Sequence, residues 1–344
     1  MAEQRVGRCT TAAGQPVAYA TVGHGPALLY EYGWLSHLQH EWVPGPFRDH
    51  LDRLAAALTV LRVDKPGFGL AGGSSIPDHE TAVAALLAAA DAVGLKKFAL
   101  RGDILGGATA IALAATHPDR VARLVLYGAH ACGEDAGGAA AIASLQALAR
   151  THWGLGSRLL ADLWMAGADP EAVEWFARLQ REIAGPEAAA AVIGYCMGTD
   201  VRALAGQVRA PTLIVHREHD RAVPLAAAQR LAELIPGARL VVVPGRAHLP
   251  WVADANSVLE PILRFLGVRA GRRAHALSPR EQEVAQMVAQ GLTNAAIASR
   301  LGIAQRTAEA HVEHILDKLA LRSRAQVAAW AVGRNPDARR GRGA

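Results

Sequence analysis

Short apolar runs alternate with alanine-rich, helix-like segments along the first 268 residues, and this alternation narrows the choice of folds sharply. The helix-like segments include residues 80–93 and 108–116. A strand that is buried on both faces has a nearly continuous apolar sequence, because helices cover each side of a parallel sheet. The sequence therefore predicts a mostly parallel sheet between two helical layers. The expected strands are residues 27–30, 59–63, 98–100, 124–127, 212–215 and 240–243.

Residues 133–206 interrupt this alternation, because they are helical in pattern throughout. A helical stretch between two sheet strands predicts a lid. A polar, glycine-containing segment at 269–274 is typical of a linker, and the pattern after it is entirely helical. The expected organisation is a sheet domain at 1–268 with its lid at about 133–206, a linker at 269–274, a small helical domain at 275–335 and a basic tail at 336–344.

Composition excludes several classes of protein. The 344 residues are 51% hydrophobic, which excludes a disordered chain. No apolar run approaches the roughly 18 residues that a membrane span needs. Cys9, Cys132 and Cys196 are too few and too scattered for a disulfide framework or a zinc site, and no metal is expected. The first five residues lack an apolar secretory core, so we expect a cytoplasmic protein.

Charge is distributed unevenly along the chain. From residue 269 to the end there are 13 Lys and Arg against 6 Asp and Glu, a net charge of +7. The whole chain carries +5, so the remainder carries −2. A nearly neutral domain followed by a basic one favours a polyanionic partner such as nucleic acid, although a solvated basic tail would give the same asymmetry.

The segment Gly102-Asp103-Ile104-Leu105-Gly106-Gly107 connects an expected strand to an alanine-rich helix. Small residues on both sides of one central position allow a tight strand-to-helix turn, because larger side chains would collide with the neighbouring helix and strand. This stretch resembles the nucleophile elbow of the α/β-hydrolase fold. The resemblance extends over residues 15–268 and implies an α/β-hydrolase fold with a helical lid.

Four further segments match that family in the order it requires. Residues 32–34, Tyr-Gly-Trp, match the oxyanion loop, and residues 64–69 match the Asp-x-x-Gly-x-Gly turn. Residues 216–224 contain Asp220 at the position of the catalytic acid. Residues 245–250 contain His248 at the position of the catalytic histidine. Residues 67–72 also fit G-x-G-x-x-G, but no helix can follow at once, so no nucleotide cofactor is expected.

The chemistry of the family does not follow from its fold, because the central elbow residue is Ile104. A hydrocarbon side chain has no lone pair with which to attack a carbonyl carbon. We therefore expect the triad positions Ile104, Asp220 and His248 to form no working triad, and the domain not to be an enzyme. One alternative is that Asp103 attacks instead, which the elbow geometry opposes. Another is that His248 and Asp220 activate water directly.

The cavity of such folds lies under the lid, at the carboxyl ends of the strands. Aromatic and aliphatic side chains would form its walls and a few polar groups would converge on it. We therefore expect a small, mainly hydrophobic ligand that carries a carbonyl or hydroxyl group, unless the tryptophans are ordinary core residues. The candidate ligand-binding residues are Tyr32, Gly33, Trp34, Ile104, Leu105, Trp153, Trp164, Asp220, His248 and Trp251.

The last helical region begins with the start signals Ser278, Pro279 and Glu281, and Gly291 can end the first helix. Thr293 can cap a second helix, and a third spans about 305–319. The region resembles the LuxR/GerE-type helix-turn-helix domain of bacterial transcription regulators over residues 275–332. The matching residues are 277–284, 291–294, 297–298, 301–303, 307, 311–312, 315–316, 318–319 and 323–324.

The resemblance implies that the third helix enters the major groove of DNA. Helical spacing of Ala308, Val312, Ile315 and Leu319 places these residues on the core face. Carboxylates stand at two positions where the family often has basic residues, and carboxylates repel phosphates unless one accepts from cytosine N4. The candidate DNA-binding residues are Thr293, Asn294, Arg306, Thr307, Glu309, Ala310, His311, Glu313 and Lys318.

Together the two domains predict a transcriptional regulator that senses a small-molecule effector and binds double-stranded DNA. Helix-turn-helix domains of this type read paired half-sites, so a homodimer is expected, with residues 323–332 as a candidate contact helix. No cofactor is expected. Two other classes remain open: an active ester or lactone hydrolase fused to a DNA-binding module, and a protein-interaction module that has lost DNA binding.

Overall fold

The computed structural model describes residues 3–73, 76–136, 138–268, 277, 279–319, 321 and 323–333. The chain divides into two compact units, Met1–Ala270 and Gly271–Ala344. The expected linker at 269–274 and the basic tail at 336–344 lie outside the described residues, and so does Ser278.

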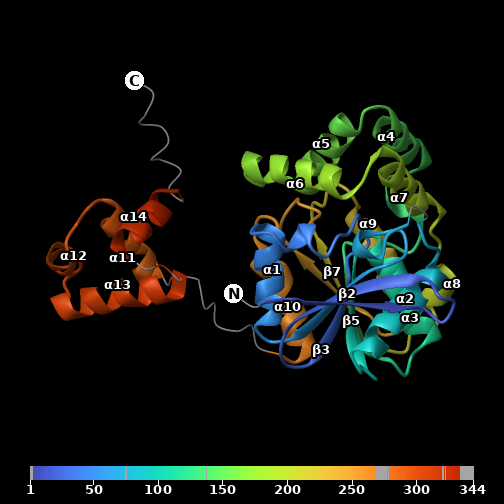
Figure 1. Ribbon diagram of the computed structural model, residues 1–344, viewed down its shortest axis with the longest axis horizontal. Coiled ribbons are helices and arrows are strands. Elements are labelled where there is room, and N and C mark those ends of the chain that lie inside the picture. Colours follow the sequence, from blue (N-terminus) through green and yellow to red (C-terminus); the bar gives the residue numbers. More distant parts are fainter. Residues whose placement is uncertain are drawn as a thin grey trace. The chain divides into compact units, whose positions relative to one another are not determined.

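A single eight-stranded sheet forms the centre of the first unit (Figure 1). Its order is β1-β2-β4-β3-β5-β6-β7-β8, and β2 alone runs against its neighbours. All six strands expected from the sequence are present, whereas β1 and β2 were not predicted. The strands are β1 (Arg5–Thr10), β2 (Pro16–Gly23), β3 (Ala27–Glu31), β4 (Thr59–Asp64), β5 (Phe98–Asp103), β6 (Val121–Tyr127), β7 (Thr212–Arg217) and β8 (Arg239–Val243).

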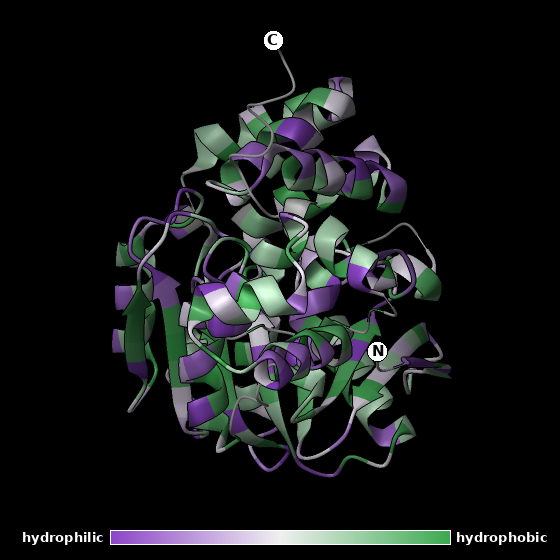
Figure 2. Cartoon of the chain, turned by 90° about the vertical axis from the view of Figure 1, so that its left-hand side faces the viewer, coloured by the Kyte–Doolittle hydropathy of each residue, from purple (hydrophilic) through white to green (hydrophobic). Residues whose placement is uncertain are grey.

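Helices cover both faces of this sheet, which is why its central strands are apolar on each side. One face packs against α1 (Pro46–Ala55) and α10 (Ala255–Leu266). The other packs against α2 (His79–Ala92), α3 (Gly106–Thr116) and α9 (Leu225–Leu234). Figure 2 shows the sheet strands as mostly hydrophobic ribbon.

The segment between β6 and β7 forms the helical lid predicted from the sequence (Figure 1). It begins with the short helix η3. Its helices α4 and α7 pack against each other along their length, and α5 packs against α6. Two further short helices, η1 (His40–Trp42) and η2 (Gly69–Ala71), lie in loops of the sheet domain. The lid helices are η3 (Gly133–Ala136), α4 (Ala139–Thr151), α5 (Trp153–Trp164), α6 (Pro170–Ile183), α7 (Pro186–Gly198) and α8 (Arg202–Ala205).

Four helices make the described part of the second unit around one apolar cluster. Ala308 and Ile315 are fully buried and Val312 is nearly so, which confirms the predicted core face of the third helix. Gly302 ends the second helix in the left-handed conformation, with φ +65°. The helices are α11 (Pro279–Ala289), α12 (Asn294–Leu301), α13 (Gln305–Leu319) and α14 (Arg324–Gly333). No helix among the described residues is long and apolar enough to cross a membrane.

Candidate functional site

The turn between β5 and α3 has the geometry that the elbow motif predicts. β5 ends at Asp103, Ile104 has φ +58°, and α3 begins two residues later. The Ile104 amide donates to the Tyr127 carbonyl at 2.8 Å, which ties the turn to β6. A Cβ at Gly106 would lie 2.4 Å from the Glu31 carbonyl oxygen, so only glycine fits there. The side chain at the apex is 4% exposed and packs into the main apolar cluster.

The expected oxyanion-loop segment lies directly against this elbow. Gly33 has φ +75°, and a Cβ on it would lie 1.7 Å from the Gly106 amide nitrogen. The backbone of the loop therefore passes over the start of α3 at a distance that no other residue permits. This close approach brings Tyr32 and Trp34, the two neighbours of Gly33, to the edge of the elbow.

Asp220 and His248 form a hydrogen-bonded pair, with His248 Nδ1 2.7 Å from Asp220 Oδ2. The other oxygen, Asp220 Oδ1, accepts from the amides of Ala222 at 2.8 Å and Val223 at 3.1 Å. Burial by itself raises the pKa of Asp220, but the charge and hydrogen bond of His248 outweigh it, so the pKa is lowered. The pair is fully buried and holds the imidazole in one orientation.

Asp103, the alternative nucleophile, is already engaged by other side chains. Arg101 Nε and Nη2 donate to its two carboxylate oxygens at 2.8 and 2.7 Å, and the Tyr30 hydroxyl donates at 2.7 Å. Both Arg101 and Asp103 are fully buried, and burial raises the pKa of Asp103 against the opposing charge of Arg101. Three donors hold this carboxylate on the α1 face of the sheet, so its hydrogen bonds have a structural role.

The predicted pocket tryptophans pack mainly against one another and against the lid. The rings of Trp34 and Trp164 meet edge-on with centroids 4.6 Å apart. Trp34 Nε1 donates to Gln180 Oε1 at 3.2 Å, and Trp153 Nε1 donates to the Ala184 carbonyl at 2.8 Å. Trp164 also lies beside the His248 ring, with centroids 5.8 Å apart. These side chains therefore join the lid to the sheet domain.

A narrow cleft between the oxyanion loop, α1 and α6 is called the aromatic cleft here. Of the predicted ligand-binding residues, Tyr32, Trp34 and Trp251 line it. The sequence prediction missed the rest of its wall, because those residues lie on α1, α6 and the η1 loop. The full lining is Tyr32, Trp34, Leu35, Glu41, Phe47, Trp175, Phe176, Leu179, Gln180, Ile183 and Trp251.

The other predicted residues are distributed differently. Gly33 and Leu105 line a second cleft, which also contacts Glu31, Lys65 and Tyr195. A third cleft is also lined by Tyr32, Gly33 and Trp34. Five predicted residues line none of these three clefts: Ile104, Trp153, Trp164, Asp220 and His248. Four of them are buried residues, and the Asp220 side chain is buried as well.

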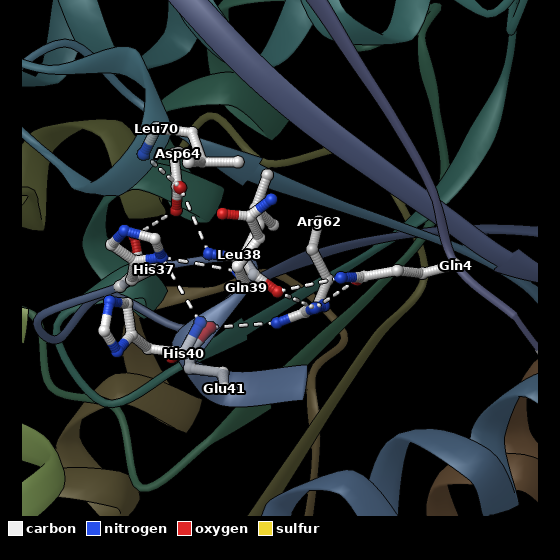
Figure 3. Close-up of polar contacts among 10 residues, drawn as sticks. Gln4, His37, Leu38, Gln39, His40, Glu41, Arg62, Asp64 and Leu70 are labelled. Carbon is white, nitrogen blue, oxygen red and sulfur yellow. Dashed lines mark hydrogen bonds and ion pairs between the residues drawn. The ribbon is translucent and has the colours of Figure 1, made fainter. Parts of the chain in front are cut away.

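A buried polar network supports one side of the aromatic cleft (Figure 3). Glu41 Oε2 accepts from Arg62 Nη1 at 2.9 Å, and Arg62 Nη2 also donates to Gln4 Oε1 at 2.9 Å. Asp64 accepts from the amides of Leu38 and Leu70 and so fixes the loop that carries Glu41. Burial raises the pKa of Glu41 to about 8 in spite of the Arg62 charge. No group of metal-ligating side chains occurs among the residues the structure describes.

In the second unit, Thr293 accepts from the Ala296 amide at 3.2 Å and caps α12 as the sequence predicts. Asn294, a candidate DNA contact, is held from within the domain. Arg324 on α14 donates to Asn294 Oδ1 at 2.7 Å and also to the Leu292 carbonyl. Asn294 and Arg324 therefore clamp α14 to the start of α12.

The remaining DNA-binding candidates lie along α13. Arg306, Thr307 and Glu313 are exposed, whereas Glu309, Ala310 and His311 are half-buried. Gln305 Nε2 donates to Glu309 Oε1 at 2.9 Å, so a neighbour on the same helix already engages the Glu309 carboxylate. The side chain of Lys318 lies outside the described residues. The exposed face of α13 thus carries Arg306 and, about two turns further along, the carboxylate of Glu313.

Fold and geometry together define an α/β-hydrolase domain followed by a helix-turn-helix domain. Residues 47–255 match the family described as serine aminopeptidase, S33, and residues 275–331 match the family described as bacterial regulatory proteins, LuxR family. The chain belongs to the S33 family of α/β hydrolases and carries a C-terminal DNA-binding domain of the LuxR type.

Two curated esterases are similar to most of this chain. The pimeloyl-[acyl-carrier protein] methyl ester esterase of Chromobacterium violaceum is 30% identical over 264 residues, which cover 73% of this chain and 98% of that protein. The protein of the same name from Xanthomonas campestris pv. campestris is 30% identical over 255 residues, covering 71% and 96%.

Solved structures agree with this fold. A hydrolase from Pseudomonas aeruginosa PA01 has a TM-score of 0.64 at 25% identity and covers 77% of this chain and 99% of its own. The enol-lactonase from Burkholderia xenovorans LB400 has a TM-score of 0.63 at 23% identity, covering 76% and 100%. At 23% identity, the similarity to the enol-lactonase shows only that the two proteins share a fold.

Proposed function

We propose that this protein is a one-component transcriptional regulator in which a hydrolase-type domain without a nucleophile binds a small, mainly hydrophobic effector. The observation that carries the proposal is Ile104, a hydrocarbon side chain at φ +58° on the strand-to-helix turn. An acyl-enzyme needs an oxygen or sulfur at that position to attack the carbonyl carbon. The cleft can then hold a ligand without cleaving it.

The LuxR-type domain supplies the output of this regulator. Ligand binding shifts DNA binding only if the ligand prefers one arrangement of lid, linker or dimer over another. The proposal therefore includes a homodimer that reads paired half-sites and responds to the effector. Arg306 and Thr307 on the exposed part of α13 support contact between this helix and DNA.

Two measurements on the purified full-length chain test the proposal. Incubation with p-nitrophenyl butyrate and with an enol-lactone should give no turnover above buffer. Selection of bound fragments from a randomised duplex library should enrich one sequence motif, and the enriched duplex should bind more tightly than its scrambled counterpart. Repeated turnover of either substrate by the wild-type chain would contradict the absence of catalysis. Failure to enrich any motif at low salt would contradict the regulator.

A second candidate function is a working hydrolase fused to the DNA-binding domain. Its support is the hydrogen bond of 2.7 Å between Asp220 and His248, which is the pairing that a general base requires. This candidate predicts ester or lactone hydrolysis that disappears in His248→Ala. Because Asp103 is bound by Arg101 and Tyr30, water activated by His248 would be the nucleophile in such an enzyme.

A further inference from the structure

Strand β8 forms one edge of the sheet, and no strand within the described part of the chain pairs with its outer side. Its sequence, Arg-Leu-Val-Val-Val, ends in three consecutive valines. Val242 is 45% exposed, and Leu240 and Val241 are half-buried. An open, apolar strand edge is a template for pairing with another strand, so folded proteins protect such an edge or cover it.

The opposite edge of the sheet has this protection. β1 carries the charged residues Arg5 and Arg8 along its length. Charged side chains on an edge strand oppose the approach of a further strand, because pairing would remove them from water. β8 has one charged residue, Arg239, and it stands at the first position of the strand. Of the two edges, β8 is therefore the one that a further strand fits.

The backbone of β8 determines how a further strand can bind. The Val243 carbonyl accepts from the Glu218 amide at 2.9 Å, so it points toward the β7 side and away from the open edge. Successive residues of a strand direct their backbone groups to opposite sides, so Leu240 and Val242 direct their N–H and C=O groups outward. These two residues thus offer two donors and two acceptors to a partner strand.

A second copy of β8 in antiparallel orientation can satisfy all of these groups. Pairing about a twofold axis at Val241 places Leu240 opposite Val242 of the partner subunit and allows four backbone hydrogen bonds. Arg239 then lies toward the far end of the partner strand, beside the exposed Glu218 of the partner subunit. Parallel pairing would instead bring the two Arg239 side chains together, which like charges oppose.

We propose that the open edge of β8 pairs antiparallel with β8 of a second copy of this chain and joins the two sheets across a twofold axis. This inference rests on the proposed function in that it locates a contact surface of the proposed homodimer. A twofold contact uses the same edge on both copies, so neither copy keeps an open β8 edge on which a filament could grow.

Two valines of nearly equal exposure provide matched variants. Val242 on β8 is 45% exposed and Val6 on β1 is 43% exposed, so lysine at either position is compatible with folding. Sedimentation velocity of the full-length chain over a concentration series measures the dimer Kd. Val242→Lys should raise this Kd at least about tenfold, because each dimer would hold two lysines against a partner strand. Val6→Lys should leave the Kd unchanged.

A cysteine at the twofold axis reports the contact directly. Residues opposite each other in a non-hydrogen-bonded antiparallel pair have Cα atoms about 4.5 Å apart, which a disulfide can span. The background variant Cys9→Ser removes the half-buried cysteine of β1. In this background, oxidised glutathione should convert Val241→Cys to a covalent dimer but should not convert Val6→Cys. Peptide mass spectrometry identifies the linked residues.

A wild-type chain that stays monomeric across the concentration series would overturn the β8 assignment. So would equal dimer Kd values for wild type and Val242→Lys, or no more covalent dimer from Val241→Cys than from Val6→Cys. These outcomes are separable from the outcome for the regulator, because duplex selection tests DNA binding by itself. Covalent dimers linked at residue 241, without any enriched duplex motif, would support the β8 contact and count against the regulator.

Discussion

Ile104 occupies a backbone conformation that a β-branched residue rarely adopts. At φ +58° its Cβ crowds the backbone, which costs about 1–2 kcal/mol relative to the right-handed region. Two hydrogen bonds fix the turn: the Ile104 amide donates to the Tyr127 carbonyl, and the Gly107 amide donates to the Ile104 carbonyl. These and the surrounding contacts must offset the cost. The strain is therefore retained at a position whose side chain cannot perform the nucleophilic attack.

This strain can be measured with two truncations at one position. Ile104→Ala and Ile104→Gly both remove the buried side chain, but only glycine relieves the positive φ. We expect Ile104→Gly to be more stable than Ile104→Ala by about 0.5–1 kcal/mol, although it has one carbon fewer. Urea unfolding followed by tryptophan fluorescence measures the difference. A glycine variant that is less stable than the alanine variant would show that the turn is not strained in solution.

His130 is a second buried residue with a measurable consequence. Burial, with the His248 charge adding to it, lowers its pKa to about 4, below the ordinary value of about 6.5. The unfolded chain therefore takes up this proton first as the pH falls. The folded state should lose stability between about pH 6.5 and pH 4, at up to about 1.4 kcal/mol per pH unit from this group.

The variant His130→Gln removes that proton uptake. Its free energy of unfolding should fall less steeply than that of the wild type between pH 6.5 and pH 4, and the two slopes should agree above pH 7. Urea titrations at several pH values measure both slopes. His24→Gln, at an exposed position, is the matched control. Parallel pH profiles for wild type and His130→Gln would refute the expected contribution.

At single positions, sequence reasoning identified the elbow and the Asp220–His248 pair but only part of the cleft wall. Motif spacing located Ile104 and Gly33, because local backbone geometry demands small residues around them. The rotation of α6 is set by tertiary packing, so Phe176 could not be assigned to the cleft. One signal was available: Gln180 is a polar residue on the apolar side of α6, and buried polar side chains need partners.

At the level of elements, β3 to β7 were predictable because they lie inside the sheet and are largely buried on both faces, and β8 at the sheet edge was predicted from its apolar run. All six residues of β7 are buried, and such a strand has an apolar run that periodicity detects. β1 was missed for the opposite reason. β1 lies at the sheet edge and is half-exposed along its length, so its sequence lacks both a continuous run and a clear alternation.

In the second unit, helix bounds could be predicted from the capping residues. Whether a side chain is free to contact DNA could not. Thr293 caps the start of α12 as predicted, and Gly302 ends the helix. Asn294 was expected to be free for DNA, yet Arg324 lies thirty positions later and holds its amide. Local sequence patterns report capping, whereas a partner on another helix becomes visible only once the helices pack.

The helix α13, which we propose contacts DNA, carries a carboxylate on its exposed face, and this carboxylate should affect affinity for DNA. Glu313 is exposed, and a carboxylate facing the phosphates of DNA opposes binding. Glu313→Gln should therefore strengthen binding to the selected duplex severalfold and do so similarly on a scrambled duplex. Fluorescence anisotropy across a salt series measures both.

Glu283→Gln is the matched control, because Glu283 is exposed in the same domain but pairs with Arg280 on α11. It should change duplex affinity less than Glu313→Gln does. The opposite change in duplex affinity for Glu313→Gln would also identify the role of this carboxylate. If Glu313→Gln weakens binding to the selected duplex alone, the carboxylate accepts from a base such as cytosine N4 and contributes sequence specificity.

For the molecule as a whole, the central question is whether the two units exchange free energy. A regulator requires that its effector changes affinity for the duplex by a factor above one. Thermodynamic linkage then demands that the duplex change the affinity for the effector by the same factor. Typical couplings of about 1–3 kcal/mol correspond to factors of about 5–150.

Titrating each ligand with and without a saturating amount of the other measures this factor twice. A substitution in the first unit that weakens effector binding should leave duplex affinity in the absence of effector unchanged, because the helix-turn-helix domain belongs to the second unit. If the two factors agree and exceed one, the cleft and the DNA-binding helix share a conformational equilibrium. If both equal one, the two domains are joined in sequence alone, and the hydrolase-type domain must act independently of DNA.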